Sequence, residues 1–337
     1  MSHFPVRKVA VLGAGVMGAQ IAAQLINCKV PVILFDLPAK EGPKNAIVAK
    51  AIEGVKKIKP APLGLASDAA LIEQANYDED LEKLRDCDVI IEAIAERLDW
   101  KEGLYQKITP FIAPHAILAT NTSGLSITAL SEAVDASVRP RFCGIHFFNP
   151  PRYMYLVELI PTPSTLPQVL DDLEAFVTSS LGKGVVRAKD TPNFIANRIG
   201  IANILATAKL TEKFGLGWDV VDDLTGKKLG RASSGTFRTA DLVGLDTLNH
   251  VIKTLQDNLD EKRDPFYPNY STPPALAKLL EMGNLGLKTG AGFYKKIGKD
   301  IQNFDAATGS YVAGGKKASD VVSRMLKKKG LFSSACG

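Results

Sequence analysis

The stretch VAVLGAGVMG at residues 9–18 decides the fold of this chain. An apolar run ends there in three glycines with the spacing G-x-G-x-x-G, and residues 19–25 follow with helical spacing. The pattern predicts a strand, a tight turn and a helix. One glycine makes the turn, one lets the backbone approach a pyrophosphate, and one lets helix and strand pack closely, while the helix start offers N–H donors to phosphates. The predicted cofactor-binding residues of this turn are Gly13, Gly15, Val16, Met17 and Gly18.

Asp36 supports this interpretation because it ends a second apolar run after the glycines. A carboxylate there accepts hydrogen bonds from a ribose 2′-hydroxyl and repels a 2′-phosphate, and no Lys or Arg follows before Lys40. We therefore expect NAD rather than NADP. Two alternatives are a glycine-containing unit with a solvated Asp36, and a secretory signal in which Arg7 and Lys8 precede the apolar run. The glycine spacing and the lack of a convincing cleavage site argue against the signal.

The composition is ordinary for a soluble globular chain, and the length of 337 residues allows two domains. The net charge of +5 comes from lysines spread along the chain, which argues against nucleic-acid binding but suits an anionic ligand. Outside residues 9–26 no apolar run approaches the length of a membrane span, so we expect no membrane insertion. We expect a cytoplasmic protein without a metal site, because no metal-like spacing links Cys28, Cys87, Cys143 and Cys336.

Further apolar runs predict more strands of the same sheet, at residues 88–93, 116–120, 141–148 and 155–160. The predicted fold class is an α/β Rossmann-type doubly wound sheet followed by an all-α C-terminal domain. We expect a cofactor domain over residues 1–189 and a helical domain over 190–296, whose first helix has Thr191 as N-cap and Pro192 in its first turn. Residues 297–337 are expected to be a tail, or the start of a further region. The other expected helices cover residues 219–225, 239–256, 274–283 and 319–329.

Two loops after predicted strands are placed to contact a ligand, because ligands bind at the carboxyl ends of strands in doubly wound sheets. The first loop carries Glu96 and Lys101, which are candidate cofactor neighbours; the alternative is an exposed ion pair that adds little stability. The second loop, NTSGLS at residues 121–126, could hold a small ligand or cap the next helix. For Ser126 we expect the cap.

Residues 43–59 predict an amphipathic helix with a lysine-rich face. Lys56 belongs to that face. The lysines could contact phosphate groups of a ligand, or they could form an ordinary solvated surface, which base rates favour.

Two polar residues interrupt neighbouring apolar strands, His146 in the first and Glu158 in the second. A buried carboxylate is costly unless it is paired, so the sequence predicts a hydrogen bond between them. The pair could be a tuned general base or a purely structural contact. Asn193 and Asn197 interrupt the long apolar helix in the same way, and Asn197 would need a partner from another helix or a ligand.

With these residues assigned, the chain resembles the L-3-hydroxyacyl-CoA dehydrogenase family over about residues 5–296. Several independent motifs carry the resemblance in the same order and spacing. They are GAGVMG at 13–18, IIEAIAE at 90–96, NTS at 121–123, HFFNP at 146–150, DTPNFIANR at 190–198 and GLKTGAGFY at 286–294.

The resemblance implies an NAD-dependent, reversible oxidation of the 3-hydroxyl group of an acyl-CoA in fatty-acid β-oxidation, by a homodimer formed through the helical domain. It implies that His146, oriented by Glu158, takes the hydroxyl proton while the C3 hydride passes to nicotinamide C4. It places substrate contacts at Ser123, Asn149, Asn197 and Lys56, cofactor contacts at Glu96, Lys101 and Asn121, and the adenine-ribose carboxylate at Asp36.

The chain departs from the minimal single-function enzymes of this family in three places. The segment 226–237 is long and basic, and Arg238-Thr239 follows it. The lysine-rich helix predicted over residues 43–59 matches the family only loosely. The chain also continues past residue 295. The continuation looks like the dehydrogenase part of a larger bacterial multifunctional β-oxidation protein, which is the alternative to a homodimer.

Two other functions stay open. One is a related hydroxy-acid or sugar-acid dehydrogenase whose substrate lacks CoA. The other is a non-catalytic NAD-binding protein similar to a lens crystallin, which would need none of the polar intrusions His146, Glu158, Ser123 and Asn197.

Overall fold

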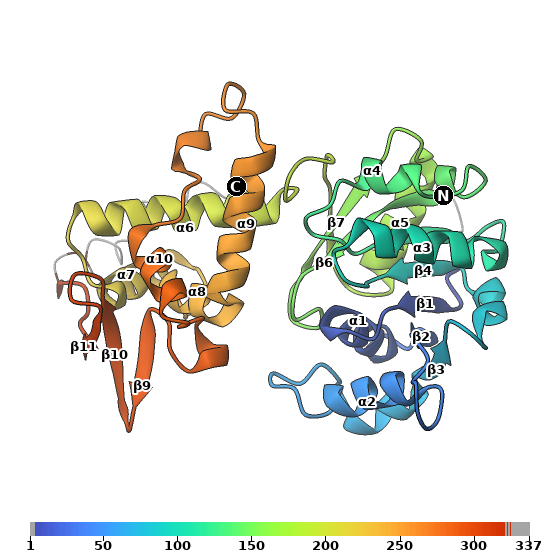
Figure 1. Ribbon diagram of the computed structural model, residues 1–337, viewed down its shortest axis with the longest axis horizontal. Coiled ribbons are helices and arrows are strands. Elements are labelled where there is room, and N and C mark those ends of the chain that lie inside the picture. Colours follow the sequence, from blue (N-terminus) through green and yellow to red (C-terminus); the bar gives the residue numbers. More distant parts are fainter. Residues whose placement is uncertain (1–3, 321, 323, 325–337) are drawn as a thin grey trace. The chain divides into compact units, whose positions relative to one another are not determined.

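A computed structural model describes residues 4–320, 322 and 324, and the chain divides into two compact units (Figure 1). The first unit is Met1–Ile195 and the second is Ala196–Gly337. The sequence placed this boundary between residues 189 and 190. Residues 190–195 group with the first unit, where Asp190 and the backbone of Ile195 make hydrogen bonds to it.

The first unit is built on one eight-stranded sheet with the order β3-β2-β1-β4-β5-β6-β7-β8. All neighbouring strands are parallel except β6 and β7, which are antiparallel. This mostly parallel sheet with helical crossovers is the predicted Rossmann-type class. The strands are β1 (Val9–Leu12), β2 (Val32–Asp36), β3 (Glu73–Asn76), β4 (Val89–Glu92), β5 (Ile117–Thr120), β6 (Phe142–Phe147), β7 (Leu156–Pro161) and β8 (Gly184–Arg187).

Strand β1 is apolar throughout because both faces of the sheet are covered. Val9 and Val11 point into one core, and Ala10 and Leu12 point into the other. The first core also contains the buried sides of α1 (Val16–Asn27), α2 (Ala46–Val55) and α5 (Pro167–Ser179). The second contains those of α3 (Leu98–Ile108) and α4 (Ile127–Glu132).

Helix α2 is shorter than the helix predicted over residues 43–59. Val48, Ile52 and Val55 are buried, as the amphipathic pattern requires, whereas Ile47 is largely exposed. Lys56 follows the last helical residue, is exposed and pairs with Glu53 at 2.5 Å.

The second unit consists of five α-helices and a small antiparallel sheet among the residues that the structure describes. Its core gathers the apolar sides of these helices around Phe237 and Ile252. The helices are α6 (Ala196–Lys213), α7 (Trp218–Thr225), α8 (Phe237–Val243), α9 (Leu245–Asn258) and α10 (Pro274–Glu281), and the strands are β9 (Tyr294–Ile297), β10 (Asp300–Asp305) and β11 (Ser310–Ala313).

Helix α6 starts later than predicted, which corrects the assignment of Thr191 as its N-cap and of Pro192 to its first turn. Asn193 and Phe194 have φ angles of 58° and 50°, and a helix cannot run through two such left-handed residues. The helix expected over 239–256 is similarly divided into α8 and α9 at Gly244, whose φ is 98°.

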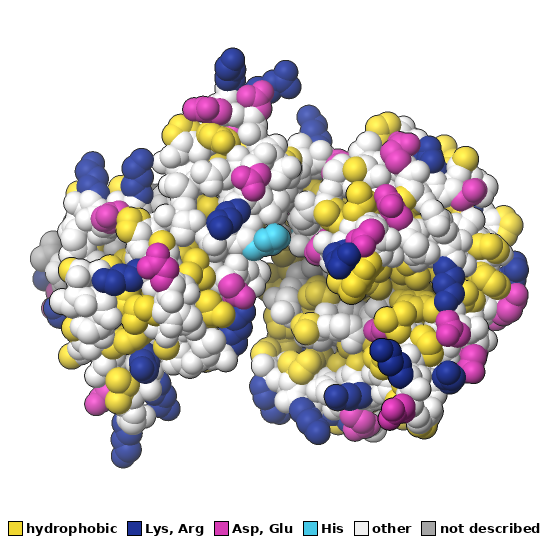
Figure 2. Space-filling model, viewed as in Figure 1, with side chains coloured by type: hydrophobic (Ala, Val, Ile, Leu, Met, Phe, Trp, Pro, Cys, Tyr) yellow, Lys and Arg dark blue, Asp and Glu magenta, His cyan; other side chains and the backbone are white. Residues whose placement is uncertain are grey.

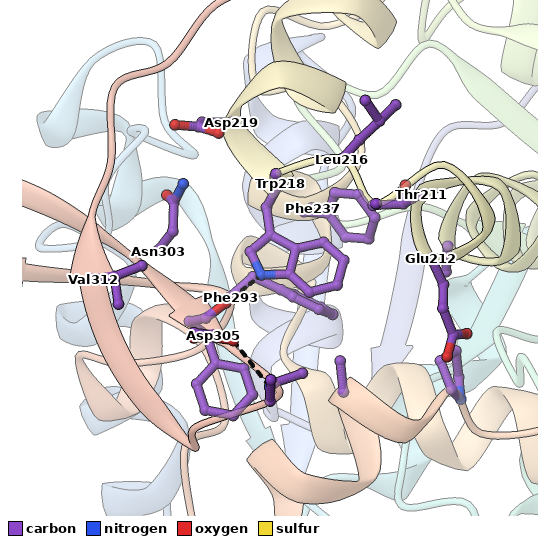
Figure 3. Close-up of a pocket in the computed structure, with 18 of the residues that line it drawn as sticks. Thr211, Glu212, Leu216, Trp218, Asp219, Phe237, Phe293, Asn303, Asp305 and Val312 are labelled. Atoms are coloured by element: carbon purple, nitrogen blue, oxygen red, sulfur yellow. Dashed lines mark hydrogen bonds between the residues drawn. The ribbon is translucent and has the colours of Figure 1, made fainter.

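Strands β10 and β11 lie in the segment that the sequence assigned to a tail. Phe304 of β10 is buried in the helical core, and its carbonyl oxygen accepts a hydrogen bond from Trp218 Nε1 at 2.6 Å. The rings of Trp218, Phe237 and Phe293 pack together beside a cavity of about 500 Å³ (Figure 3). The helix expected over 319–329 lies largely outside the described residues.

Candidate active site

A cavity of about 490 Å³ lies at the carboxyl ends of the central strands in the first unit. Its walls come from the glycine turn after β1, from Asp36 at the end of β2, from residues 93–95 after β4 and from Trp100 on α3. This is the edge of the sheet where the sequence predicts a dinucleotide.

The three glycines of the turn have three different surroundings. Gly13 has a φ of 103°, and a Cβ atom on it would lie 2.8 Å from the carbonyl oxygen of Ala93. On Gly18 a Cβ atom would lie 1.8 Å from the carbonyl oxygen of Gly13. On Gly15 it would meet nothing within 4 Å. Gly15 therefore leaves open space at the start of α1.

The start of α1 and Asp36 fit the two ends of an adenosine diphosphate group. Helix α1 has no side-chain cap and no acidic residue in its first turn, so no side chain at its own start competes for its first N–H groups. Asp36 accepts hydrogen bonds from the N–H groups of Ala14 at 2.6 Å and Leu37 at 2.7 Å. These bonds fix the carboxylate against the glycine turn, where it can also accept from a ribose hydroxyl.

Lys101 is a buried residue of α3 and does not lie in an exposed loop. Its ammonium group is 2.6 Å from Glu92 Oε1, and the two side chains are 1% and 0% exposed. The carboxylate of Glu92 also accepts hydrogen bonds from Tyr105 and Thr120, at 2.9 and 2.7 Å. Lys101 is thus held inside the domain by Glu92, and its contact with the cofactor stays a prediction. The sequence does not single out Glu92, which stands within the run predicted as a strand over residues 88–93.

Glu96 contacts the polar loop after β5 and makes no ion pair with Lys101. Its carboxylate accepts hydrogen bonds from Thr122 Oγ1, from the Ser123 N–H at 2.8 Å and from Ser123 Oγ at 3.3 Å. Asn121 of the same loop accepts a hydrogen bond from the N–H of Phe147 at 2.9 Å. These contacts bring the loops after β4 and β5 to the end of β6.

His146 and Glu158 are directly opposite each other on β6 and β7, and the predicted hydrogen bond is present. His146 Nδ1 lies 2.7 Å from Glu158 Oε2, and Glu158 Oε1 accepts from the N–H of Ile195 at 3.0 Å. The imidazole packs against the rings of Phe148 and Phe194. The two polar side chains are 5% and 0% exposed, so each is satisfied by the other in a nearly dry setting.

Ser126 is the N-cap of α4, as predicted, and accepts from the Ala129 N–H at 3.1 Å. Asp190 completes the cap from a distant part of the chain. It accepts from Ser126 Oγ at 2.7 Å and from the N–H groups of Ile127 and Thr128 at 3.0 and 2.8 Å. Local sequence rules give no signal for such a contact, because the partners are more than sixty positions apart.

The remaining predicted site residues occupy three different settings. Asn149 is exposed after β6 and accepts a hydrogen bond from Gln20 Nε2 at 3.1 Å. Asn197 is half-buried in the first turn of α6, in the second unit. Lys56 is paired with Glu53 on the surface.

Within residues 4–320, 322 and 324, no group of three or more His, Cys, Asp or Glu side chains could hold a metal ion. No helix in this part of the chain has the length and apolar character to cross a bilayer. On the face in Figure 2, lysine and arginine side chains are scattered among acidic ones.

A Rossmann-type sheet with an open glycine turn, an acidic residue after β2 and a buried His–Glu pair is typical of NAD-dependent oxidoreductases. Family models give the same assignment. The 3-hydroxyacyl-CoA dehydrogenase NAD binding domain matches residues 8–191, and the C-terminal domain of the same enzymes matches residues 194–296.

Individual relatives agree. A Deinococcus radiodurans protein named as a probable 3-hydroxyacyl-CoA dehydrogenase is 44% identical over 86% of this chain and 83% of its own. A Rickettsia felis protein named as a fatty acid oxidation complex trifunctional enzyme is 39% identical, over 86% of this chain but only 40% of its own. The crystal structure of (S)-3-hydroxybutyryl-CoA dehydrogenase PaaH1 from Ralstonia eutropha matches with a TM-score of 0.68 and 29% identity, over 86% of this chain and 98% of that one.

The chain belongs to the 3-hydroxyacyl-CoA dehydrogenase family and is an NAD-dependent oxidoreductase. It spans most of the Deinococcus relative and less than half of the Rickettsia relative.

Proposed function

We propose that this protein catalyses the NAD-dependent, reversible oxidation of (S)-3-hydroxyacyl-CoA to 3-ketoacyl-CoA, with His146 as the general base. The observation that carries the proposal is the buried hydrogen bond between His146 and Glu158 near the carboxyl end of β6, the edge of the sheet where the cofactor cavity opens. The names of the Deinococcus and Ralstonia relatives support the substrate class.

His146 is prepared for proton transfer by the residues around it. Because Glu158 is bonded to Nδ1, the other ring nitrogen, Nε2, is the one that takes the proton from the 3-hydroxyl group. A charged Glu158 also stabilises the imidazolium that forms. Bound NAD supplies the acceptor for the hydride that leaves C3. Phe148 and Phe194 pack on the imidazole and keep water from the proton-transfer path.

The other predicted residues hold the substrate and cofactor in this proposal. Ser123 is fixed by Glu96 and orients the acyl group. Asn197 is likewise assigned a contact with the acyl group. Asn149 and Lys56 contact the CoA portion. Positioning of this kind is a large part of what a hydride-transfer enzyme contributes.

We further propose a role in cytoplasmic fatty-acid β-oxidation, either as a homodimer or as part of a multifunctional polypeptide. The name of the Rickettsia relative supports the pathway and the second arrangement. Acyl chain length depends on residues that contact the acyl tail, and the basic segment 226–239 is the candidate that differs from minimal enzymes.

The decisive experiment measures NADH consumption with acetoacetyl-CoA, a long-chain 3-ketoacyl-CoA and the free β-keto acid. We expect turnover with the thioesters only. Turnover with the free acid alone would favour a related hydroxy-acid or sugar-acid dehydrogenase instead. Binding of NADH without turnover of any substrate would contradict the proposed activity.

His146→Gln tests the general base. We expect its kcat to fall by about 10²–10⁴-fold, because proton transfer by a positioned base contributes that much, while the Kd for NADH changes less than about twofold. The matched control is His115→Gln, which removes a half-exposed imidazole beside Asp88, before the start of β4. A His146→Gln enzyme that keeps most of its kcat would exclude the assignment.

A further inference from the structure

The buried carboxylate of Glu92 has no role in the chemistry described above, yet it receives four hydrogen bonds. Lys101 Nζ donates to Oε1 at 2.6 Å, and so does the N–H of Ile94 at 2.7 Å. Tyr105 and Thr120 donate their hydroxyl protons to Oε2. Burial and the charge of Glu92 raise the pKa of Tyr105 far above its usual value, so the hydroxyl group stays a donor.

These donors come from three separate elements of the cofactor edge. Ile94 is in the loop after β4, Lys101 and Tyr105 are on α3, and Thr120 ends β5. Glu92 therefore ties all three to the end of β4.

The loop that Glu92 fixes is a wall of the cofactor cavity. Residues 93–95 line the cavity, and the carbonyl group of Ala93 lies against Gly13 of the glycine turn. The N–H of Ala93 donates to the carbonyl oxygen of Leu12 at 2.7 Å, which holds the loop beside the turn. Helix α3 contributes Trp100 and Leu104 to the same cavity.

The far end of the loop reaches the proposed catalytic side. Glu96 binds the backbone N–H and the hydroxyl group of Ser123. A change in the loop would therefore alter both the cofactor wall and the substrate-facing serine.

A buried ion pair is weak evidence for a role in stability, because well-packed apolar residues often do as well. The four hydrogen bonds that Glu92 accepts instead fix the positions of their four donor groups. We propose that Glu92 is a positioning residue for NAD: it holds the loop after β4 and the start of α3 in the shape that the cofactor binds, so that binding does not have to order them. The inference rests on NAD binding and not on the acyl-CoA substrate.

The test compares two double variants that each remove both buried charges. Glu92→Met/Lys101→Met leaves the Ile94 N–H without an acceptor, whereas Glu92→Gln/Lys101→Met keeps an amide oxygen that can accept from it. We expect the Kd for NADH, measured by nucleotide fluorescence, to rise about tenfold or more in the first variant, which corresponds to the cost of ordering a few side chains on binding. In the second variant most of the affinity should return.

The matched control is Asp88→Asn, which changes a buried acid immediately before β4 at the opposite end of that strand. It should lower the unfolding midpoint and leave the Kd for NADH unchanged. We also expect KM for NAD to rise more than kcat falls in the double-Met variant, which a loss of general stability would not produce.

A folded double-Met variant that binds NADH within twofold of the wild type would overturn the proposal. If that variant does not fold, Tyr105→Phe/Thr120→Val removes two neutral donors and keeps the ion pair, and we expect it to weaken NADH binding about threefold. Unchanged affinity in that variant would count against the role equally. Because NADH binding needs no acyl substrate, these results are independent of the proposed reaction.

Discussion

At the scale of single residues, Gly15 and Gly18 belong to the same sequence motif but are required for different reasons. Gly18 is needed by the protein itself, because a Cβ atom there would overlap the carbonyl oxygen of Gly13. Gly15 is needed only by the ligand, since a Cβ atom there meets no protein atom within 4 Å. The two positions should therefore respond differently to the same substitution.

We expect Gly15→Ala to fold with wild-type stability and to weaken NADH binding at least about tenfold, because the new methyl group would occupy space that the pyrophosphate needs. Gly18→Ala should lose about 3 kcal/mol of stability or more through direct overlap. Thermal unfolding and NADH titration of both variants check this. Equal stability losses in the two variants would contradict it.

The His146–Glu158 hydrogen bond could be predicted from the sequence because each residue stands alone in an apolar strand, and a buried carboxylate needs a partner. Lys101 could not. It belongs to an exposed-looking polar segment, and only the packing of α3 on the sheet shows that its ammonium group turns inward to Glu92. Long side chains reach several ångströms from their Cα atoms, so position in a loop does not fix where the charge lies.

At the scale of elements, α4 shows how a short helix is stabilised by a remote segment. Ser126 gives the local cap that the sequence predicts, with its hydroxyl oxygen as acceptor, and Asp190 adds a carboxylate acceptor at the same end. A helix of six residues has little intrinsic stability, so these contacts matter more than in a long helix.

Removing the two caps should have unequal effects. We expect Ser126→Ala to cost about 1 kcal/mol and Asp190→Ala about 2 kcal/mol, because Asp190 receives three hydrogen bonds and Ser126 receives one from the helix. Glu132→Ala, at the exposed end of the same helix, should stay within about 0.5 kcal/mol of wild type. Urea unfolding measures all three. A larger loss for Ser126→Ala than for Asp190→Ala would be the wrong order.

Strands β1, β2, β4, β5, β6 and β7 were predictable because their apolar runs are continuous, as strands buried on both faces require. Strand β3, with the sequence EQAN, has no such run and was not predicted. The start of α6 could not be predicted from the sequence. Thr191 and Pro192 have good helix-start propensities, but tertiary contacts hold Asn193 and Phe194 in left-handed conformations so that the backbone of Ile195 can reach Glu158. Strands β10 and β11 were also missed, since a polar, glycine-rich segment gives little strand signal.

At the scale of the whole molecule, the second unit carries a titratable group that opposes its own stability. Asp241 of α8 is buried, and burial raises its pKa to about 6 although the N–H groups of Phe293 and Tyr294 hydrogen-bond to it. Asp241 therefore binds its proton more tightly in the folded state than in the unfolded chain. Relative to the unfolded chain, the contribution of Asp241 is most favourable below pH 4 and is lost as the pH rises through 6.

We expect this penalty to appear as a pH-dependent difference between the wild type and Asp241→Asn. A rise in pKa from 3.8 to about 6 corresponds to about 3 kcal/mol, so the wild type should lose about that much stability relative to the variant between pH 4 and pH 7. Urea unfolding of both proteins at several pH values measures the difference. A difference that does not change with pH would refute the buried titration.

The hydrogen bond from Ile195 to Glu158 also governs how this chain could be recombined with its relatives. A chimaera that takes its helical unit from another family member would exchange the left-handed pair Asn193 and Phe194 if the crossover fell between residues 190 and 193. Such a hybrid would keep His146 and Glu158, but the residue at position 194 that packs on the imidazole would come from the other protein. A crossover after residue 195 transfers the helices and keeps His146, Glu158, Phe194 and the backbone of Ile195 in one parent.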